Sequence, residues 1–311
     1  MIQKFLILLF FSFSFIQAQV EDFLYYKNLN DSETRLSEFK DSDEMLRVKL
    51  EQLKYINVSR AKYEAKPVKL DILACRVANK QSKEAAENNF QGHWNLRGEK
   101  PYHRWGNAGG HDHIGENAAS KWFSGKLDKS LENQLLLMKE SHDYFMSETP
   151  PNDGHKLQVI DKVHNYVGIG CYINDHQFRY YEEYIDRYIK FIDITPDKGN
   201  PDGNILIVKP ISDKHFVYAV IVYYEPLPSP MSVEEVNSMS SYPDFTDEIA
   251  MDLWPWHLKQ DEDTGNYRIP FSFNKSGSYY FHIYLSEEKF TEGYANTEGK
   301  IQASGIVIFI E

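Results

Sequence analysis

Cysteine is scarce in this chain, with only Cys75 and Cys171 among 311 residues. Two thiols exclude a framework of several disulfides and a tetrahedral metal site built from thiolates. Cys75 falls in a predicted helix and Cys171 in a predicted strand. A single bridge between them is geometrically feasible outside the cytoplasm, and two separately buried thiols are the other interpretation. The sequence leaves both open.

Positive charge is also in short supply. The chain has 34 Lys and Arg against 46 Asp and Glu, which gives a formal net charge of −12. Because phosphate backbones require concentrated Lys and Arg, nucleic acid is not an expected partner. The sequence also lacks a Gly-x-Ser-x-Gly elbow, a His-Glu-x-x-His helix and a phosphate-binding loop. Any catalysis would therefore have to come from other histidines and carboxylates.

Long apolar runs are missing except at the N-terminus. There Lys4 precedes an apolar run from Phe5 to Ile16, and Gln17-Ala18-Gln19 follows it. This pattern is typical of a secretory signal peptide over residues 1–19, and the run is too short to span a bilayer. We expect a secreted or periplasmic protein without a transmembrane segment in its mature chain. A buried N-terminal strand is the alternative.

The first half of the chain mixes helical and strand patterns. Residues 20–42 carry scattered charge and little periodicity, which predicts a loosely structured leader. The stretch 88–120 is rich in Gly, His, Asn and Trp without a sustained period, which predicts a long loop. Between and after these stretches, apolar spacing and capping residues predict helices over 43–62, 71–86, 131–145 and 155–163, and strands over 166–173 and 177–188.

The second half shows only strand patterns. Residues 195–204, TPDKGNPDGN, are dense in turn-forming residues and predict a linker. Alternating aromatic and β-branched residues then predict an antiparallel sandwich over 205–311. The expected strands are 205–208, 216–224, 267–273, 278–285 and 305–310. With a mixed domain over 43–194, the sequence predicts an α+β protein.

Several short motifs follow one another in the first domain. They are Gly92-His93-Trp94, Gly115-Glu116-Asn117, a helix bearing Glu140, and Asp153-Gly154-His155 followed by Gly168-Ile169-Gly170. In this order, over roughly residues 55–189, they resemble the CAP superfamily of cysteine-rich secretory proteins, antigen 5 and pathogenesis-related proteins. The resemblance implies an α-β-α sandwich with a central antiparallel sheet. The all-β domain after it is expected to be an immunoglobulin-like sandwich.

The resemblance also implies a large cleft lined by two histidines and two glutamates. Carried over by motif, these cleft-binding residues are His93, Glu116, Glu140 and His155. His93 and His155 would be the metal ligands, with zinc or another divalent metal as the cofactor. Two neutral imidazoles with nearby carboxylates and a water suit such a metal. The alternative is a rigid polar cleft that holds no metal.

Glu140 is the least secure of these matches. Family members often have Trp three residues before this glutamate, and here that position is Leu137. Glu148 is the fallback, although it lies beside the break at Pro150. His111 and His113 precede Glu116, either as further ligands or as solvated loop residues.

These observations lead to a binding and interaction protein as the preferred function. Its ligand would be a small molecule, lipid, sterol or peptide, and its partner an extracellular protein. No catalytic residue is assigned. A metal-dependent, peptidase-like hydrolase is the alternative, in which Glu116 and Glu140 would act on water or as acid and base. A third possibility is a structural, adhesin-like protein with a vestigial cleft.

Overall fold

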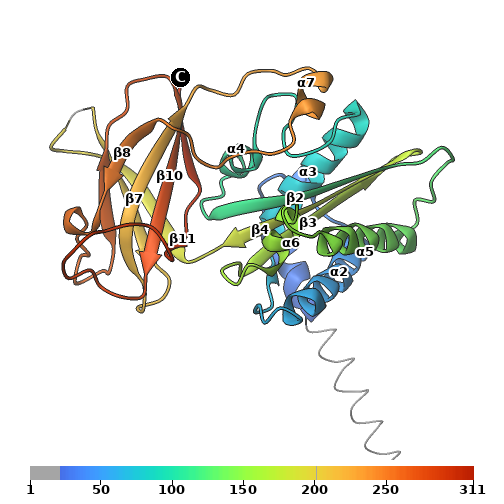
Figure 1. Ribbon diagram of the computed structural model, residues 1–311, viewed down its shortest axis with the longest axis horizontal. Coiled ribbons are helices and arrows are strands. Elements are labelled where there is room, and N and C mark those ends of the chain that lie inside the picture. Colours follow the sequence, from blue (N-terminus) through green and yellow to red (C-terminus); the bar gives the residue numbers. More distant parts are fainter. Residues whose placement is uncertain (1–21, 201) are drawn as a thin grey trace, which may run out of the picture.

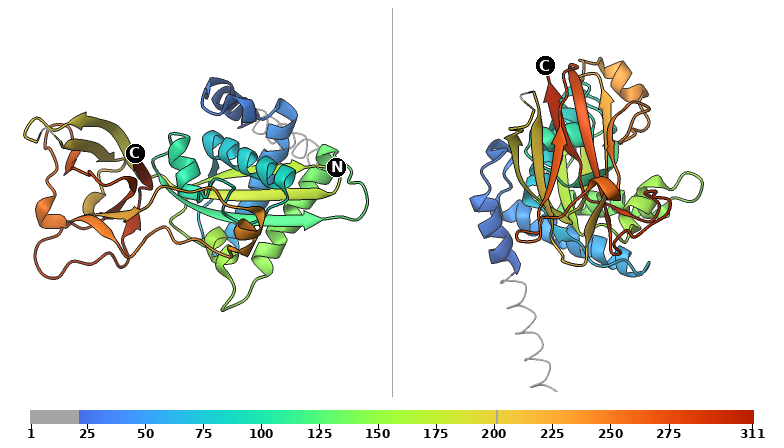
Figure 2. Two further views of the ribbon diagram at one scale, coloured as in Figure 1. Left: turned by 90° about the horizontal axis from the view of Figure 1, so that it is seen from above. Right: turned by 90° about the vertical axis from the view of Figure 1, so that its left-hand side faces the viewer.

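The computed structural model describes residues 22–200 and 202–311, so that the expected signal peptide lies outside the described residues. The chain forms two parts that lie side by side, one built from helices and a sheet and the other almost entirely from strands (Figure 1 and Figure 2).

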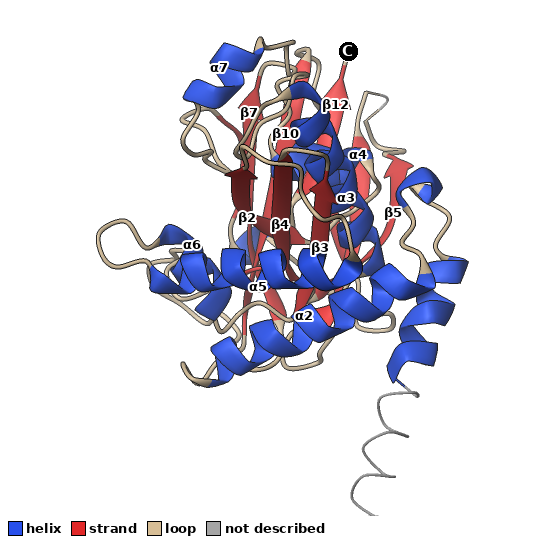
Figure 3. Ribbon diagram, turned by 90° about the vertical axis from the view of Figure 1, so that its right-hand side faces the viewer, coloured by secondary structure: helices blue, strands red, loops and turns tan. Residues whose placement is uncertain are grey.

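The first part contains a four-stranded sheet in the order β1-β3-β4-β2. The β1–β3 pair is parallel and the other two pairs are antiparallel. Helices α2 and α5 cross one face of this sheet (Figure 3). The elements are α2 (Asp43–Ala61), β1 (Lys69–Leu70), α3 (Ile72–Asn88), α4 (Pro101–Asn107), β2 (His113–Trp122), α5 (Leu131–Ser147), α6 (Gly154–Ile160), β3 (Tyr166–Ile173) and β4 (Gln177–Asp186).

Alternation along β3 explains how helices cover both faces. A Cβ added at Gly168 or Gly170 would lie within 2.5 Å of α3 backbone, so that α3 packs directly on this face of the strand. Val167 and Ile169 point the other way and are fully buried in the core shared with α2 and α5. Small residues on one side and branched ones on the other therefore fix the three layers.

The expectation of a loosely structured leader was wrong. Residues 22–32 form a helix, and Phe23 and Tyr26 are buried against the first part. The buried Arg76 donates to the backbone oxygens of Asn30 and Arg35 at 2.8 and 2.6 Å. Only a few residues of this segment carry the packing, and the charges around them hide the helical spacing.

The stretch predicted as a loop also contains regular structure, namely α4 and most of β2. The motif Gly115-Glu116-Asn117 lies inside β2 and not in a loop. This strand has no alternation of apolar and polar residues, since only Ile114, Ala118 and Ala119 among residues 113–121 are apolar and Gly115, Glu116 and Asn117 interrupt them. Its pairing with β4 is therefore invisible to pattern analysis.

The second part is made of two sheets that pack around one core. One sheet has the order β5-β6-β9, and the other has β11-β10-β7-β8 with β12 also paired to β10. Its strands are β5 (Ile189–Pro196), β6 (Asn204–Pro210), β7 (Phe216–Glu225), β8 (Ile249–Leu253), β9 (Tyr267–Phe271), β10 (Gly277–Ser286), β11 (Ile301–Gln302) and β12 (Ile306–Ile310).

The boundary between the two parts differs from the expected linker at 195–204. The first sheet ends at Asp186, and β5 already belongs to the second part. Residues 197–203 are the turn between β5 and β6, closed by the Asp197 amide, which donates to the Gly203 carbonyl at 2.9 Å. Turn-forming composition marks a hairpin as readily as a linker, and only the pairing of the flanking strands distinguishes the two.

A long connection joins the two parts a second time. Residues 226–248, between β7 and β8, leave the second part and run over the first (Figure 1). We call this segment the strap. It contains α7 (Val233–Ser238), whose Val236 is buried beside Phe90. The Met231 amide donates to Leu96 O at 2.9 Å, and the Trp94 indole donates to Ser241 O at 3.1 Å.

Ion pairs fix the junction between the two parts. His113 Nδ1 lies 2.6 Å from Asp186 in the first part, and its Nε2 lies 3.4 Å from Asp244 in the strap. Nearby, Lys100 of the first part donates to Glu225 of β7 at 2.6 Å. His113 therefore links the first sheet to the strap. His111 stacks on Phe191, with 4.0 Å between ring centroids.

Both cysteines are free thiols. Cys75 Sγ accepts the Ile169 amide at 3.2 Å, while Cys171 Sγ lies 3.8 Å from the Gln134 side-chain oxygen. Burial raises the pKa of each thiol to about 12. Both thiols are therefore protonated near neutral pH and are poor nucleophiles.

Packing of α3 on β3 gives a stability prediction. In Gly168→Ala the new Cβ would lie 2.4 Å from Ala74 backbone, and overpacking of this kind costs about 1–3 kcal/mol. Denaturant unfolding should show that loss. The control is Gly125→Ala, where no atom of the described residues lies within 4 Å of the new Cβ. An equal change in both variants would contradict the packing argument.

The junction gives a pH prediction. Burial lowers the pKa of His113, but hydrogen bonds to Asp186 and Asp244 outweigh burial and raise it to about 10. Because the folded pKa exceeds the unfolded value of about 6.5, the stabilisation is complete below that pH and is lost as the pH rises towards 10. The stability difference between wild type and His113→Gln should therefore shrink between pH 6.5 and 10. Denaturant unfolding across this range measures it, and a constant difference would contradict the assignment.

Candidate functional site

A cavity of about 660 Å³ lies at the edge of the first sheet. Its walls come from the end of β2, from α5, from the loop after α3 and from the strap. The lining residues are mostly polar. They include Gln91, His93, Ser120, Lys121, Glu140, Ser141, Tyr144, His155, Asn237, Ser238 and Ser240.

His93 is held on one side of this cavity by Glu116. Its Nδ1 lies 2.9 Å from Glu116 Oε1, and the other carboxylate oxygen accepts from the Arg104 guanidinium. Arg104 also donates to the His93 carbonyl at 2.6 Å. Burial would raise the pKa of Glu116, but Arg104 and His93 outweigh burial and hold it below its usual range. Glu116 is therefore an anion that fixes the His93 ring.

His155 is held on the other side by Glu148. The residue stands in the first turn of α6, and its Nδ1 lies 2.5 Å from Glu148 Oε1. The His155 amide donates to the second oxygen of the same carboxylate at 3.0 Å. The ring also stacks on Phe145, with 4.8 Å between centroids and 25° between planes. Carboxylate and aromatic contacts together fix its orientation.

The two imidazoles meet beyond the edge of β2. Glu116, which holds His93, and Asn117, whose side chain donates to the His155 carbonyl at 2.9 Å, are consecutive in this strand. Consecutive side chains point to opposite faces of a sheet. His93 and His155 thus come from opposite faces, yet their ring centroids are 6.3 Å apart. Since β2 is the edge strand, the rings approach each other past that edge.

Glu140 lines the cavity but forms no hydrogen bond with either ring. Its carboxylate pairs with Lys121 at 2.6 Å, and half of its side-chain surface is exposed. The structure thus brings His93, Glu116 and His155 together, with Glu148 as the carboxylate partner of His155. The turn after α5 returns the chain to the cavity, so that Glu148 at the end of the helix reaches the ring and Glu140, two turns earlier, does not.

Glu183 is a second buried carboxyl that sequence analysis missed. It faces Glu116 across the β2–β4 pair and is fully buried, and neither of its oxygens has a hydrogen-bond partner among the described residues. Burial and the neighbouring Glu116 raise its pKa well above the usual range, which favours the protonated form. The available sequence signal was the adjacent pair Glu182-Glu183 inside an otherwise aromatic-rich strand.

Tyr242 is also part of the site, and it comes from the strap. Its hydroxyl accepts the Glu116 amide at 3.0 Å, and its ring lies edge-on to His93 with 5.0 Å between centroids. Nothing in the sequence around Tyr242 signals this contact, because more than a hundred residues separate it from Glu116.

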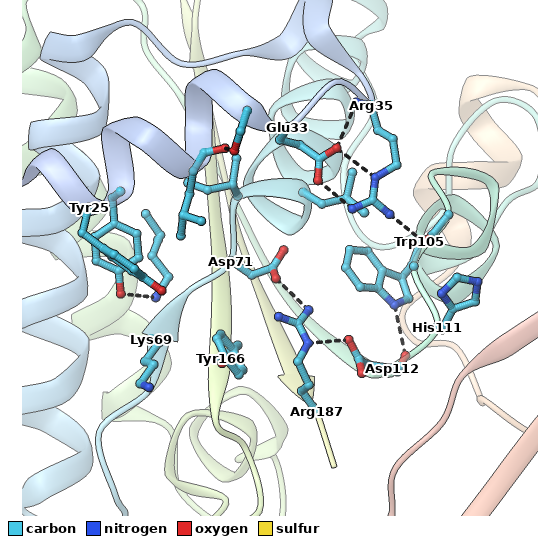
Figure 4. Close-up of a pocket in the computed structure, with 18 residues that line it drawn as sticks. Tyr25, Glu33, Arg35, Lys69, Asp71, Trp105, His111, Asp112, Tyr166 and Arg187 are labelled. Carbon is cyan, nitrogen blue, oxygen red and sulfur yellow. Dashed lines mark hydrogen bonds and ion pairs between the residues drawn. The ribbon is translucent and has the colours of Figure 1, made fainter. Parts of the chain in front are cut away.

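A second cavity, of about 500 Å³, lies beside the helix over residues 22–32 (Figure 4). Arg187 bridges Asp71 and Asp112 there at 2.8 and 2.9 Å. Burial raises the pKa of Asp112 to about 6, although Arg187 lowers it. None of the four residues predicted for the cleft lines this cavity, and its central carboxyl groups are both paired with Arg187.

Comparisons with known proteins identify the first part. Residues 53–184 match the model of the cysteine-rich secretory protein family, CAP. An extracellular protein containing an SCP domain from Bacillus anthracis is 18% identical, with a TM-score of 0.32 over 42% of this chain and 38% of that one. An outer surface protein from Borrelia burgdorferi is 18% identical, with a TM-score of 0.35 over 45% of this chain and 92% of that one.

The chain therefore spans less than two fifths of the length of the Bacillus anthracis protein. None of the curated proteins matches the chain. No helix among the described residues is long and apolar enough to cross a membrane. On the family match, residues 53–184 of this chain form a CAP domain.

Proposed function

We propose that this protein is an exported binding protein whose CAP cleft holds a divalent transition metal between His93 and His155 and receives a polar ligand. The observation that carries the proposal is the pairing of each imidazole. Glu116 and Glu148 hold the Nδ1 atoms, and the described residues offer no hydrogen-bond partner to either Nε2. A carboxylate on one ring nitrogen is the usual support for a metal on the other.

The donor set fits a weakly held metal. Within residues 22–200 and 202–311, no group of three or more potential ligands gathers around one point, so that two imidazoles would be the protein ligands. Water or a ligand oxygen would complete the coordination. The 6.3 Å between ring centroids is about 1 Å more than two imidazoles on one tetrahedral zinc would have, given Zn–N bonds of about 2.0–2.1 Å. The rings would close by a small movement on binding.

A bound zinc would supply a Lewis acid that accepts an oxygen of the ligand. The residues of this chain orient the site. Glu116, itself held by Arg104, fixes the His93 ring, and Glu148 fixes His155. Serines and asparagine on the cavity walls offer hydrogen bonds, and this lining favours a polar ligand over a lipid or sterol.

The hydrolase alternative has less support. Both oxygens of Glu116 accept hydrogen bonds from other side chains, and Glu140 is ion-paired with Lys121. Neither carboxylate is free to take a proton from a water between the imidazoles, which a general base has to do. Binding therefore remains the function that the geometry supports best.

Export and the character of the second part belong to the same proposal. The apolar run over residues 5–16 supports a signal peptide. An immunoglobulin-like relationship remains a hypothesis for the two packed sheets, which would serve as the surface for an extracellular protein partner.

Zinc titration tests the proposal. Calorimetry should show saturable binding to the wild type, and loss or at least a tenfold weakening in His93→Ala and in His155→Ala, because each variant removes one of two protein ligands. His176→Ala is the matched control, since His176 is exposed and its ring forms one hydrogen bond among the described residues, donated by Nδ1 to the Gly125 carbonyl. Equal heats in wild type and His155→Ala would rule out His155 as a ligand.

The glutamate partners give a sharper test. Glu148→Gln should weaken zinc binding by about 10–100-fold, because the carboxylate that orients His155 is lost. Glu140→Gln removes only a rim ion pair and should change the affinity by less than about twofold. Competition against a chromogenic chelator measures both. If Glu140→Gln weakened zinc binding more than Glu148→Gln did, Glu140 and not Glu148 would be the glutamate that supports the metal site.

A further inference from the structure

We propose that the cleft binds an extended peptide, which joins the first sheet as an added strand along the free edge of β2. This inference rests on the proposed function in one respect, namely that a polar ligand enters the cleft. It names the class of ligand and the backbone groups that hold it.

The strand β2 has one unpaired edge. It is the last strand of the sheet and pairs only with β4. In an antiparallel pair, the backbone groups of alternate residues point towards the neighbour and away from it. The Glu116 amide points away, because it donates to Tyr242 Oη at 3.0 Å. By alternation, the amides and carbonyls of Ala118 and Ser120 face the same open side.

The hydrogen bond that continues the β2–β4 ladder independently supports this register. The Phe123 amide donates to the His176 carbonyl at 2.9 Å, and these two residues follow the opposite pair Trp122 and Gln177. In an antiparallel pair, opposite residues that exchange backbone hydrogen bonds alternate with those that do not. Counting back in steps of two from Phe123 makes Lys121, Ala119 and Asn117 the residues bonded to β4, so that the backbone groups of Ser120, Ala118 and Glu116 point away from it.

The edge is divided into a covered half and an open half. The strap covers the first half through Tyr242, and residues 114–117 are buried. Residues 118–121 are partly exposed and line the cavity, and the register directs the Ala118 and Ser120 amides away from β4. An unpaired edge is a template for a further strand, which proteins normally protect. Here it is left open only inside the cleft.

The histidines stand where an added strand would begin. His93 and His155 flank β2 from its two faces and meet beyond its edge at about the level of Glu116 and Ala118. The backbone carbonyl or terminal carboxylate of a peptide that pairs with Ala118 would therefore face the free nitrogens of both rings. Tyr242 blocks the edge at Glu116, which fixes where the peptide ends.

The walls of the cavity suit a peptide. An added strand would present its side chains alternately to α5, with Ser141 and Tyr144, and to the strap, with Asn237 and Ser238. Backbone pairing then gives affinity, and these two walls give selectivity. The polar lining offers little to a lipid chain.

Proline at position 120 is the direct test. In Ser120→Pro the outward amide is lost while the ladder to β4 is retained, because that amide does not face β4, and proline is tolerated on such an edge. Ser120→Ala is the matched control, since it removes the hydroxyl and keeps the amide. The probe is a synthetic library of octapeptides, from which binders to the wild type are selected. Binding of these should weaken by about tenfold or more in Ser120→Pro and by less than about twofold in Ser120→Ala.

Hydrogen exchange separates edge pairing from other modes of binding. In the free protein the Ala118 and Ser120 amides should exchange quickly, and those of Ala119 and Lys121, which pair with β4, slowly. A selected peptide should protect Ala118 and Ser120. Selected peptides that bind Ser120→Pro normally, or a library without binders, would overturn the proposal.

The same peptides distinguish this inference from the proposed metal site. If they bind His93→Ala as well as the wild type but lose affinity for Ser120→Pro, the edge site stands without a contribution from His93, and the zinc titration alone decides the metal site. If zinc binds as proposed but no peptide protects Ser120, the metal site stands and the peptide proposal falls.

Discussion

The edge position of β2 is the constraint on which the candidate site depends. Because no strand covers its outer side, side chains from opposite faces of the sheet can meet around it. His93 approaches from the side of α4 and His155 from the side of α5 and α6, and their rings come within 6.3 Å between centroids. In the middle of a sheet the same residues would be separated by backbone. The cleft therefore exists because β2 is the last strand of this sheet.

Carboxylates fix the orientation of the two imidazole rings. Each imidazole is bound at Nδ1 by a glutamate, and the buried Glu116 is balanced by the equally buried Arg104. A buried carboxylate without such a partner would be costly, and burial beside Glu116 raises the pKa of Glu183 and so favours its uncharged form. The same electrostatics that stabilises the ring orientation leaves no spare base next to the imidazoles, which is why binding fits the site better than hydrolysis.

The second part of the chain is not a separate appendage. Its strap lays Tyr242 against His93 and Glu116 and forms a wall of the cleft with residues 237–240. His113, between Asp186 and Asp244, holds the strap to the first sheet through ion pairs with both carboxylates. The CAP domain and the strand-rich part therefore build one site, and the strap determines which half of the β2 edge stays open.

The sequence by itself determined the helices with clear apolar spacing, the β3–β4 hairpin and the family resemblance. It also singled out His93 and His155 by their motifs. Periodicity and short motifs are local properties, so that one sequence is enough to find them. It did not determine the leader helix, the pairing of β2 or the place where the second part begins, since each depends on packing against distant residues. Only the tertiary structure decided that Glu148 and not Glu140 holds His155, and that Glu183 and Tyr242 join the site. These contacts join segments far apart in the chain, and physical proximity of that kind leaves no periodic trace in one sequence.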